Sequence, residues 1–254
     1  MAITISVALQ KGGVGKTTTA QTLASILGSK NNRVLLVDMD SQCNSSFFSG
    51  VEEPEFTIID LLANDCKIDE ATISCDYYDF LSGDERLANI EKLDEVDINL
   101  LKDTLSVVQD NYDYIIIDTP PALGNLLECS LMASNYVIIS TDPRPFAVRG
   151  LDALKRTIEA VQASNKALKV LGILLVRYNE RTVLNRQLKE ILDDRASQMN
   201  TTVFTTFIRE CIAVPEAQAM CMSLIDYAPK SNPFIDYKSF TEEVIERIGV
   251  VNNG

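Results

Sequence analysis

The chain has 254 residues, of which 46% are hydrophobic and 23% are charged, and its formal net charge is −13. This length and composition fit one folded domain and exclude an intrinsically disordered chain. Histidine is absent, which excludes Ser–His–Asp and Cys–His catalysis as well as histidine-ligated metal sites.

Short runs of β-branched residues alternate with longer stretches of helical periodicity. The predicted strands cover residues 3–9, 33–38, 77–81, 114–118, 136–140, 170–176 and 202–207. The predicted helices cover residues 16–29, 57–63, 100–111, 124–133, 148–163, 184–198, 215–222 and 235–248. Several strands are apolar throughout, which is typical of strands buried on both faces of a parallel sheet. The pattern predicts a single α/β domain over residues 1–254, with a doubly wound, mostly parallel sheet flanked by helices.

The negative charge is concentrated in one segment. Residues 51–100 carry 15 acidic and 3 basic side chains, whereas residues 141–254 carry 14 acidic and 15 basic ones. The acidic segment is also the least periodic part of the chain, and we expect it at an edge of the sheet. A locally basic surface elsewhere therefore stays possible despite the net charge.

The cysteines and the apolar runs bear on compartment. The six cysteines contain no C-x-x-C pair, so we expect reduced, mostly buried thiols rather than a zinc or redox site. No apolar run reaches about 18 residues, so no transmembrane helix is expected. The N-terminus lacks the pattern of a secretory signal, and we expect a cytoplasmic protein.

A glycine-rich turn, QKGGVGKTT, connects the first predicted strand to the first predicted helix. The backbone N–H groups of such a turn point at phosphate, and the start of the helix adds positive partial charge. Lys16 is expected at the β- and γ-phosphates, and the Thr17 hydroxyl at Mg²⁺. The nucleotide-binding residues predicted in this turn are Gly12, Gly13, Val14, Gly15, Lys16, Thr17 and Thr18.

The turn departs from both common glycine-rich patterns. The pattern G-x-x-x-x-G-K-[ST] would need glycine where Gln10 stands, and G-x-G-x-x-G would need glycine where Thr18 stands. Lys11 is a second lysine in the turn, and a nucleotide held within one subunit does not need it. We therefore predict a deviant phosphate loop in which Lys11 has a separate role.

Aspartates follow two of the predicted strands. Asp118 ends the run YIIID, where it would face the ligand crevice and suit a Mg²⁺ ligand through water. Asp38 and Asp40 end the second predicted strand, and one of them could position the water that attacks the γ-phosphate. The residues alone leave that choice open. The predicted metal set is Thr17, Asp40 and Asp118.

In this order, KGGVGKTTT, VLLVDMDSQ and IIIDTPPALG resemble the ParA/MinD superfamily of deviant Walker-A ATPases. Most of the chain is similar to the small, Soj-like ParA partition ATPases. The further similar stretches are FLSGDERLANIE, STDPRPFAVRGLDAL, VRYNERT and TTFIRECIAVPEAQA. The resemblance implies a P-loop NTPase fold, ATP and Mg²⁺ as cofactors, and an ATPase that is weak alone and stimulated by a partner.

The resemblance also implies roles for single residues. Lys11 would cross an ATP-dependent dimer interface and touch the phosphates of the partner's nucleotide, so that Lys11 and Lys16 are both catalytic. Asp40 matches the acidic residue that orients the hydrolytic water. Asn179 and Pro215 match residues that lie near the adenine.

The first switch of the family usually reads D-x-D-P-Q-G-N, whereas this chain has DMDSQCN. Ser41 stands in place of proline and Cys43 in place of glycine, which changes backbone freedom in a loop that rearranges on hydrolysis. We expect these departures to affect the hydrolysis rate and the switch geometry more than nucleotide binding.

The branch of the superfamily follows from the remaining motifs. The acidic end FTEEVIERIGVVNNG lacks the basic amphipathic helix of MinD-like proteins, so no stable membrane anchor is expected. The resemblance favours a nucleoid-associated partition ATPase that forms an ATP-dependent homodimer, binds DNA nonspecifically, responds to a ParB-like activator and segregates a plasmid, chromosome or mobile element. The candidate DNA contacts are Arg209, Arg181, Arg186, Lys189, Arg195 and Lys230. A positioning ATPase that acts on a protein or membrane surface, and a scaffold that scarcely hydrolyses ATP, remain as alternatives.

Overall fold

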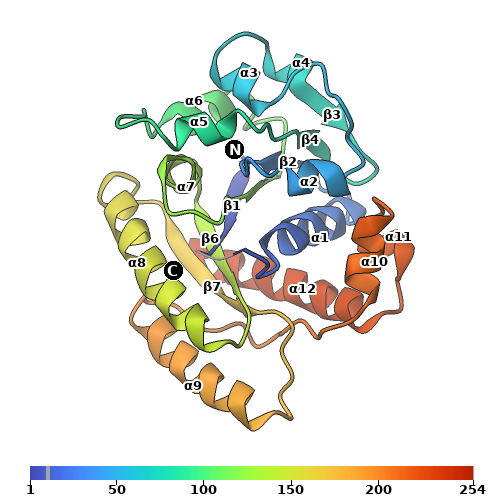
Figure 1. Ribbon diagram of the computed structural model, residues 1–254, viewed down its shortest axis with the longest axis vertical. Helices are drawn as coiled ribbons and strands as arrows, with labels where there is room; N and C mark the ends of the chain where they lie inside the picture. The colour runs from blue at the N-terminus through green and yellow to red at the C-terminus, as the bar shows by residue number, and fades with distance from the viewer. Residues whose placement is uncertain (10–11, 254) are drawn as a thin grey trace.

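The computed structural model describes residues 1–9 and 12–253, so Gln10, Lys11 and Gly254 lie outside the described residues. The described chain forms a seven-stranded sheet with the order β3-β4-β2-β5-β1-β6-β7 (Figure 1). Its strands are β1 (Ile3–Ala8), β2 (Val34–Asp38), β3 (Thr72–Ser74), β4 (Asp79–Leu81), β5 (Tyr114–Asp118), β6 (Tyr136–Thr141) and β7 (Lys169–Leu175). All neighbouring strands pair in parallel except β3 and β4. The predicted doubly wound, mostly parallel sheet is therefore confirmed.

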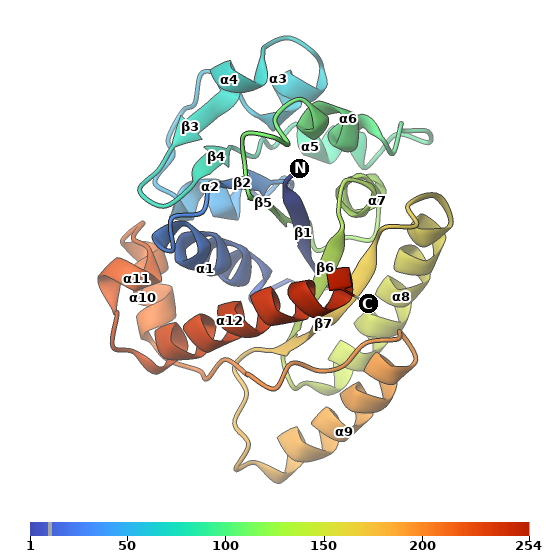
Figure 2. The same ribbon diagram turned by 180° about the vertical axis from the view of Figure 1, so that it is seen from behind.

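Helices cover both faces of the sheet, and each face has its own hydrophobic core. The long helices α1 and α12 pack on one face, whereas α6, α7, α8 and α9 pack on the other (Figures 1 and 2). The larger helices are α1 (Lys16–Ser29), α6 (Leu100–Ser106), α7 (Asn125–Met132), α8 (Pro145–Ser164), α9 (Val183–Ser197), α10 (Ala213–Ala219) and α12 (Asn232–Asn253). The strands between these layers are apolar on both sides, as the fully buried VLLVD of β2 illustrates.

The acidic segment lies at one edge of the sheet, as expected. It forms the antiparallel pair β3 and β4 and several single-turn helices around them. The short helices are α2 (Asn44–Phe48), α3 (Ile58–Leu62), α4 (Ile68–Ala71), α5 (Leu87–Ile90) and α11 (Leu224–Tyr227), of which only α3 was predicted. Among the elements of the acidic segment, the sequence predicted β4 and α3, but it missed β3, α4 and α5, because three or four residues are too few to show a repeat.

The seventh predicted strand, residues 202–207, is wrong. This segment runs beside β7 but makes only isolated bridges, at Val203 and at Ile208, in the described chain. Side chains of α12 take the place of a second strand ladder. The Glu243 carboxylate accepts hydrogen bonds from the backbone N–H groups of Thr205 (2.9 Å) and Thr206 (3.0 Å).

Arg247 is a second side chain of α12 that hydrogen-bonds to the backbone of this region. Its guanidinium donates to the carbonyl of Leu171 at 2.9 Å and to that of Val203 at 3.1 Å. It also lies 3.9 Å from the centroid of the Phe204 ring, which is cation–π range. The backbone of this segment is satisfied by helix side chains, a contact that no local pattern could have revealed.

Candidate nucleotide-binding site

A cleft of about 640 Å³ opens at the carboxyl end of the sheet, where β1 leads into α1. This is the place where open α/β sheets bind ligands, and the volume suits a nucleotide. Its walls come from the glycine-rich turn, the loop after β2, and the segment between residues 208 and 218. The lining includes Gly12, Gly13, Gly15, Lys16, Thr17, Thr18, Asp40, Pro121, Arg177, Arg209, Pro215 and Gln218.

The glycine-rich turn adopts a conformation that requires glycine at two positions. Gly13 has a φ of 70° and Gly15 a φ of 76°, both in the left-handed region. No atom of the described residues lies within 4 Å of the position that a Cβ on Gly13 would occupy, and Gly13 lines the cleft. The helix α1 begins at Lys16, and its first N–H groups and dipole add to an anion-binding surface.

Lys16 is buried within this surface. Burial lowers the pKa of its ammonium group, while the nearby carboxylates of Asp118 and Asp40 act in the opposite direction. The structure thus brings the predicted lysine and both predicted carboxylates together in one site.

Asp118 has the features of a metal ligand. It is fully buried at the end of β5, and its Oδ2 accepts a hydrogen bond from the Ser45 hydroxyl at 2.8 Å. Its Oδ1 has no hydrogen-bond partner among the described residues. Burial raises the pKa of Asp118 to about 6, although the charge of Lys16 and a hydrogen bond from Thr17 oppose the shift. A bare carboxylate oxygen beside a threonine hydroxyl fits Mg²⁺, which prefers oxygen ligands.

The structure distinguishes the two aspartates that the sequence left open. Asp38 is fully buried and accepts from the backbone N–H of Asp40 (3.1 Å) and from both the N–H (3.0 Å) and the hydroxyl (2.9 Å) of Ser46. Burial, and then the charge of Asp118, raise the pKa of Asp38 to about 8. Asp38 therefore organises the loop, whereas Asp40 lines the cleft.

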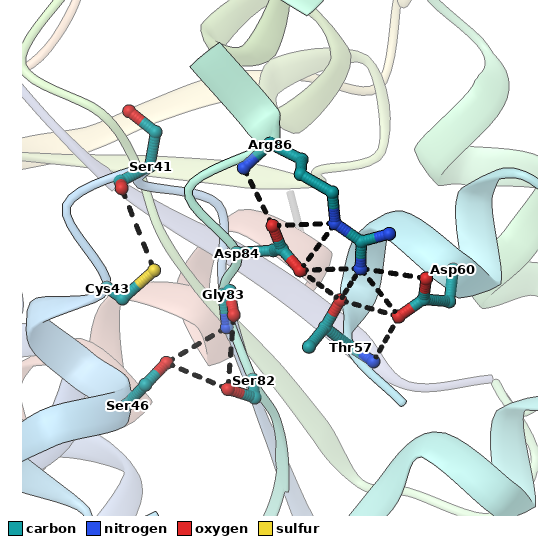
Figure 3. Close-up of polar contacts among 9 residues, drawn as sticks. All are labelled: Ser41, Cys43, Ser46, Thr57, Asp60, Ser82, Gly83, Asp84 and Arg86. Atoms are coloured by element: carbon teal, nitrogen blue, oxygen red, sulfur yellow. Dashed lines mark hydrogen bonds and ion pairs between the residues drawn. The ribbon is translucent and has the colours of Figure 1, made fainter. Parts of the chain in front are cut away.

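The loop after β2 is held from the acidic edge of the sheet. The Ser46 hydroxyl accepts hydrogen bonds from Ser82 Oγ (3.1 Å) and from the backbone N–H of Gly83 (2.9 Å), as Figure 3 shows. A Cβ on Gly83 would lie 2.9 Å from Cγ of Asp38, so the two segments are in direct contact. The acidic edge thus supports the carboxyl group that shapes the site.

An ion cluster fixes that edge. The Arg86 guanidinium lies 2.7 Å from an oxygen of Asp84 and 2.8 Å from one of Asp60, and the Thr57 hydroxyl donates to both carboxylates (Figure 3). Arg86 and the hydrogen bonds of Thr57 hold the pKa of Asp60 and of Asp84 below the usual value, against the effect of burial. Thr57 and Asp60 also form the capping box that starts α3.

Cys43 occupies a backbone position that favours the glycine of the family pattern. Its φ is 52°, so it holds the left-handed conformation for which glycine is the usual residue. Its Sγ contacts the carbonyl of Ser41 at 3.7 Å (Figure 3). Burial and the surrounding carboxylates raise the pKa of the Cys43 thiol to about 12, which keeps it protonated and unreactive at neutral pH.

Of the two residues predicted near the adenine base, the structure places only one at the cleft. Pro215 lines the cleft, but Asn179 is exposed and is not among the described lining residues. The Oδ1 of Asn179 accepts from the backbone N–H of Arg181 at 3.0 Å, which shapes the turn before α9. Lys11, predicted to reach the partner's nucleotide, lies outside the described residues.

The candidate DNA contacts have different surroundings. Arg209 lines the cleft and forms a two-pronged ion pair with Asp236, at 2.6 Å and 2.9 Å. Lys189 pairs with Asp193 and Arg195 with Asp152. The exposed candidates for which no ion pair is recorded in the described chain are Arg181, Arg186 and Lys230.

The sequence did not single out three side chains that reach the site. Ser45 holds Asp118, Ser140 contacts the carbonyl of Val14, and Arg177 contacts the carbonyl of Gly13. A serine in the short helix α2, a serine on β6 and an arginine after β7 carry no local signal of such contacts. Separately, the described helices include none that is both long and apolar enough to span a membrane.

The fold and this cleft define a P-loop NTPase, and comparisons give the family. The model of an AAA domain family matches residues 2–170. The chromosome-partitioning ATPase Soj of Treponema pallidum is 34% identical over 94% of this chain and 96% of its own. The chain belongs to the ParA/MinD superfamily of P-loop ATPases and is a Soj-like member of it.

Two solved structures share the fold. Cobyrinic acid a,c-diamide synthase from Mycobacterium smegmatis, with bound ADP and magnesium, has a TM-score of 0.80 and 31% identity, over 95% of this chain and 93% of its own. A plasmid partition protein from Borrelia burgdorferi, bound to AMPPNP, has a TM-score of 0.79 and 29% identity, over 98% of both chains.

Proposed function

We propose that this protein is an ATP-switched partition ATPase. The observation that carries the proposal is the bare Oδ1 of buried Asp118, next to Lys16 and Asp40 in a cleft lined by a deviant phosphate loop. Relatives that match nearly the whole chain are named as chromosome-partitioning proteins, which supports the cellular role.

The residues divide the chemistry of ATP hydrolysis among them. The amides of the glycine-rich turn and Lys16 bind the phosphates, and the Thr17 hydroxyl and Asp118 hold Mg²⁺. Bound Mg²⁺ would neutralise charge on the β- and γ-phosphates. Asp40 orients the attacking water. Burial raises the pKa of Asp40, and the hydrogen bond from the backbone N–H of Gln42 and the charge of Lys16 oppose that shift.

In this proposal, the protein forms a homodimer when ATP is bound. In this proposal Lys11 reaches the nucleotide of the second subunit, as the resemblance implies. A dimer that needs ATP on both sides would couple hydrolysis to dissociation.

The dimer would bind DNA nonspecifically and release it after a ParB-like activator stimulates hydrolysis. Arg181 and Arg186 support this step because both are exposed next to or within α9. Figures 1 and 2 show α9 at the opposite end of the molecule from α3, α4 and β3 of the acidic segment. This separation keeps phosphate away from most of the negative charge.

DNA binding in three nucleotide states tests the proposal. Gel shifts on nonspecific duplex DNA should show binding with ATP and Mg²⁺, and little with ADP or no nucleotide. Binding should weaken steeply with salt, and Arg186→Ala should reduce it, because phosphate contacts release counterions. Lys102→Ala, which removes an exposed positive charge on α6, is the matched control and should bind as the wild type does. Equal binding in all three states would refute the DNA-switch role.

A second candidate is a positioning ATPase whose track is a protein or a membrane surface. It is favoured by the ion pairs that already occupy Arg209, Lys189 and Arg195, which leave a thin basic surface. ATP-dependent sedimentation with anionic liposomes, together with absence of DNA binding, would support it. If hydrolysis stays at background with DNA, the scaffold alternative gains support; a measurable rate that Asp40→Ala abolishes would exclude it.

A further inference from the structure

We propose that Arg177 is a positioning residue of the phosphate loop, whose backbone it holds together with Ser140 from the two neighbouring strand ends. This inference rests on the ATP binding in the proposed function and adds residues that the family resemblance did not assign.

Two carbonyls of the loop are held by side chains from neighbouring strands. The Arg177 Nη2, just beyond β7, donates to the carbonyl of Gly13. The Ser140 hydroxyl, on β6, donates to the carbonyl of Val14 at 2.7 Å. The two consecutive peptide groups are therefore tied to the two strands that lie side by side at this end of the sheet.

The direction of these contacts determines where the loop's donors point. A trans peptide group is planar, so its C=O and N–H point to opposite sides. With the Gly13 carbonyl turned toward Arg177, the N–H of Val14 points the other way; with the Val14 carbonyl turned toward Ser140, the same holds for the N–H of Gly15. These are the donors that a phosphate loop presents to its ligand.

Arg177 is itself fixed on both sides. The N–H groups of its neighbours Val176 and Tyr178 bond to the carbonyls of Thr141 (2.8 Å) and Ile208 (3.0 Å). Between them, Arg177 takes a φ of 53°, an unfavourable conformation for a residue with a long side chain. Such strain persists where the surroundings overdetermine it, and it concentrates at functional sites.

A buried carboxylate holds the guanidinium in place. The Nη2 of Arg177 lies 2.9 Å from Oδ2 of Asp142, whose side chain is only 1% exposed. The Nε of Arg177 is buried and has no hydrogen-bond partner among the described residues. The guanidinium is thus oriented by its Nη2 contacts, with its positive charge beside the phosphate loop. Arg144 also pairs with Asp142, at 2.9 Å, but its side chain is 60% exposed.

Nucleotide titrations of the full chain test this role. Arg177→Met should weaken the binding of ATP and ADP about tenfold to a hundredfold, the effect of losing hydrogen bonds from a charged donor. AMP, which has no β-phosphate, should lose much less affinity. Arg177→Lys should recover part of the loss, because an ammonium keeps the charge without the fork that reaches both partners. Ser140→Ala should weaken ADP binding in the same direction.

Arg144→Met is the matched control, since it removes another partner of Asp142 without touching the loop, and its ADP affinity should equal that of the wild type. Circular dichroism shows which variants fold. If Arg177→Met does not fold, Arg177→Lys and Ser140→Ala decide the question. Wild-type affinity for ADP in the folded variants, or an equal loss for AMP and ADP, would overturn the inference. A wild-type protein that binds no ATP would instead overturn the proposed function.

Discussion

Asp38 and Asp118 are two buried carboxyl groups at directly paired positions of neighbouring strands, β2 and β5. Each hydrogen-bonds to a serine of α2, Asp118 to Ser45 and Asp38 to Ser46. Burial makes the ionised pair costly, and its negative charge is what a divalent cation would neutralise. The apoprotein therefore stores an electrostatic cost that ligand binding relieves.

This cost predicts how stability depends on pH. The native pKa is about 8 for Asp38 and about 6 for Asp118, against an ordinary value of 3.8 for both. Between the ordinary and the native pKa the native state binds more protons than the unfolded state, so these groups lower the free energy of unfolding as pH rises from about 4 to 8. Urea unfolding of the metal-free protein should show this decline, and a smaller one for Asp118→Asn. Equal slopes for the two proteins would contradict the assignment.

The same variant tests the metal ligand. ATP with Mg²⁺ at a hundred times its Kd should stabilise the wild-type protein by about 2.7 kcal/mol relative to the ligand-free protein. The same concentration of ATP with a chelator should stabilise it less. In Asp118→Asn the Mg²⁺-dependent part should disappear, because the substitution removes the negative charge of the carboxylate that would hold Mg²⁺. Thermal-shift measurements at fixed nucleotide concentration would show this. An undiminished Mg²⁺ effect would place the metal elsewhere.

Among the elements, α1 carries the phosphate loop and packs unusually close to the turn before β4. A Cβ on Gly28 would lie 1.7 Å from the carbonyl oxygen of Tyr77, which is backbone and cannot move aside alone. The position of α1, and so of the loop at its start, depends on this contact between a helix and the edge of the sheet.

Gly28→Ala should therefore destabilise the protein by about 1 to 3 kcal/mol, as overpacking does. Gly249→Ala is the matched control: it also lies in a helix, but its Cβ would meet no atom of the described residues within 4 Å. That substitution should be neutral or stabilise by up to about 1 kcal/mol, because alanine favours helix. Denaturant unfolding of both variants would distinguish close packing from helix propensity; an equal effect of the two changes would contradict the packing argument.

At the scale of the whole molecule, the acidic edge of the sheet and α9 lie at opposite ends. The acidic edge contacts the loop after β2 through Ser82, Gly83 and Ser46, whereas α9 lies at the far end of the molecule (Figures 1 and 3). The ATP site lies between them. A partner at one end and a negatively charged track at the other would both act on the same site.

The proposed dimer is tested through Lys11. Lys11→Ala should keep ATP binding but lose ATP-dependent dimerisation, because its role is assigned to the other subunit's phosphates. Light scattering coupled to size-exclusion chromatography, with and without ATP, measures this. Lys16→Ala, by comparison, should lose nucleotide binding itself. A Lys11→Ala protein that still dimerises with ATP would remove the cross-subunit role.

The sequence alone determined the α/β class, the sheet's parallel core and the residues of the phosphate loop. These depend on local patterns: strand burial, helical periodicity and glycines next to Lys16. It could not determine that residues 202–207 leave the sheet, because Glu243 and Arg247 satisfy their backbone from α12. The residues alone also left the choice between Asp38 and Asp40 open, and only the family resemblance implied Asp40.

Only the tertiary structure shows where these groups lie, because each position depends on groups distant in the chain. Ser46 donates to the buried Asp38, Asp40 lines the cleft, and Arg177 reaches Gly13 across 164 positions of sequence. A phosphate loop can be identified from the types and the spacing of residues that are neighbours in the sequence. The orientation of its donors and carboxylates is decided by the strands and helices that fold around it.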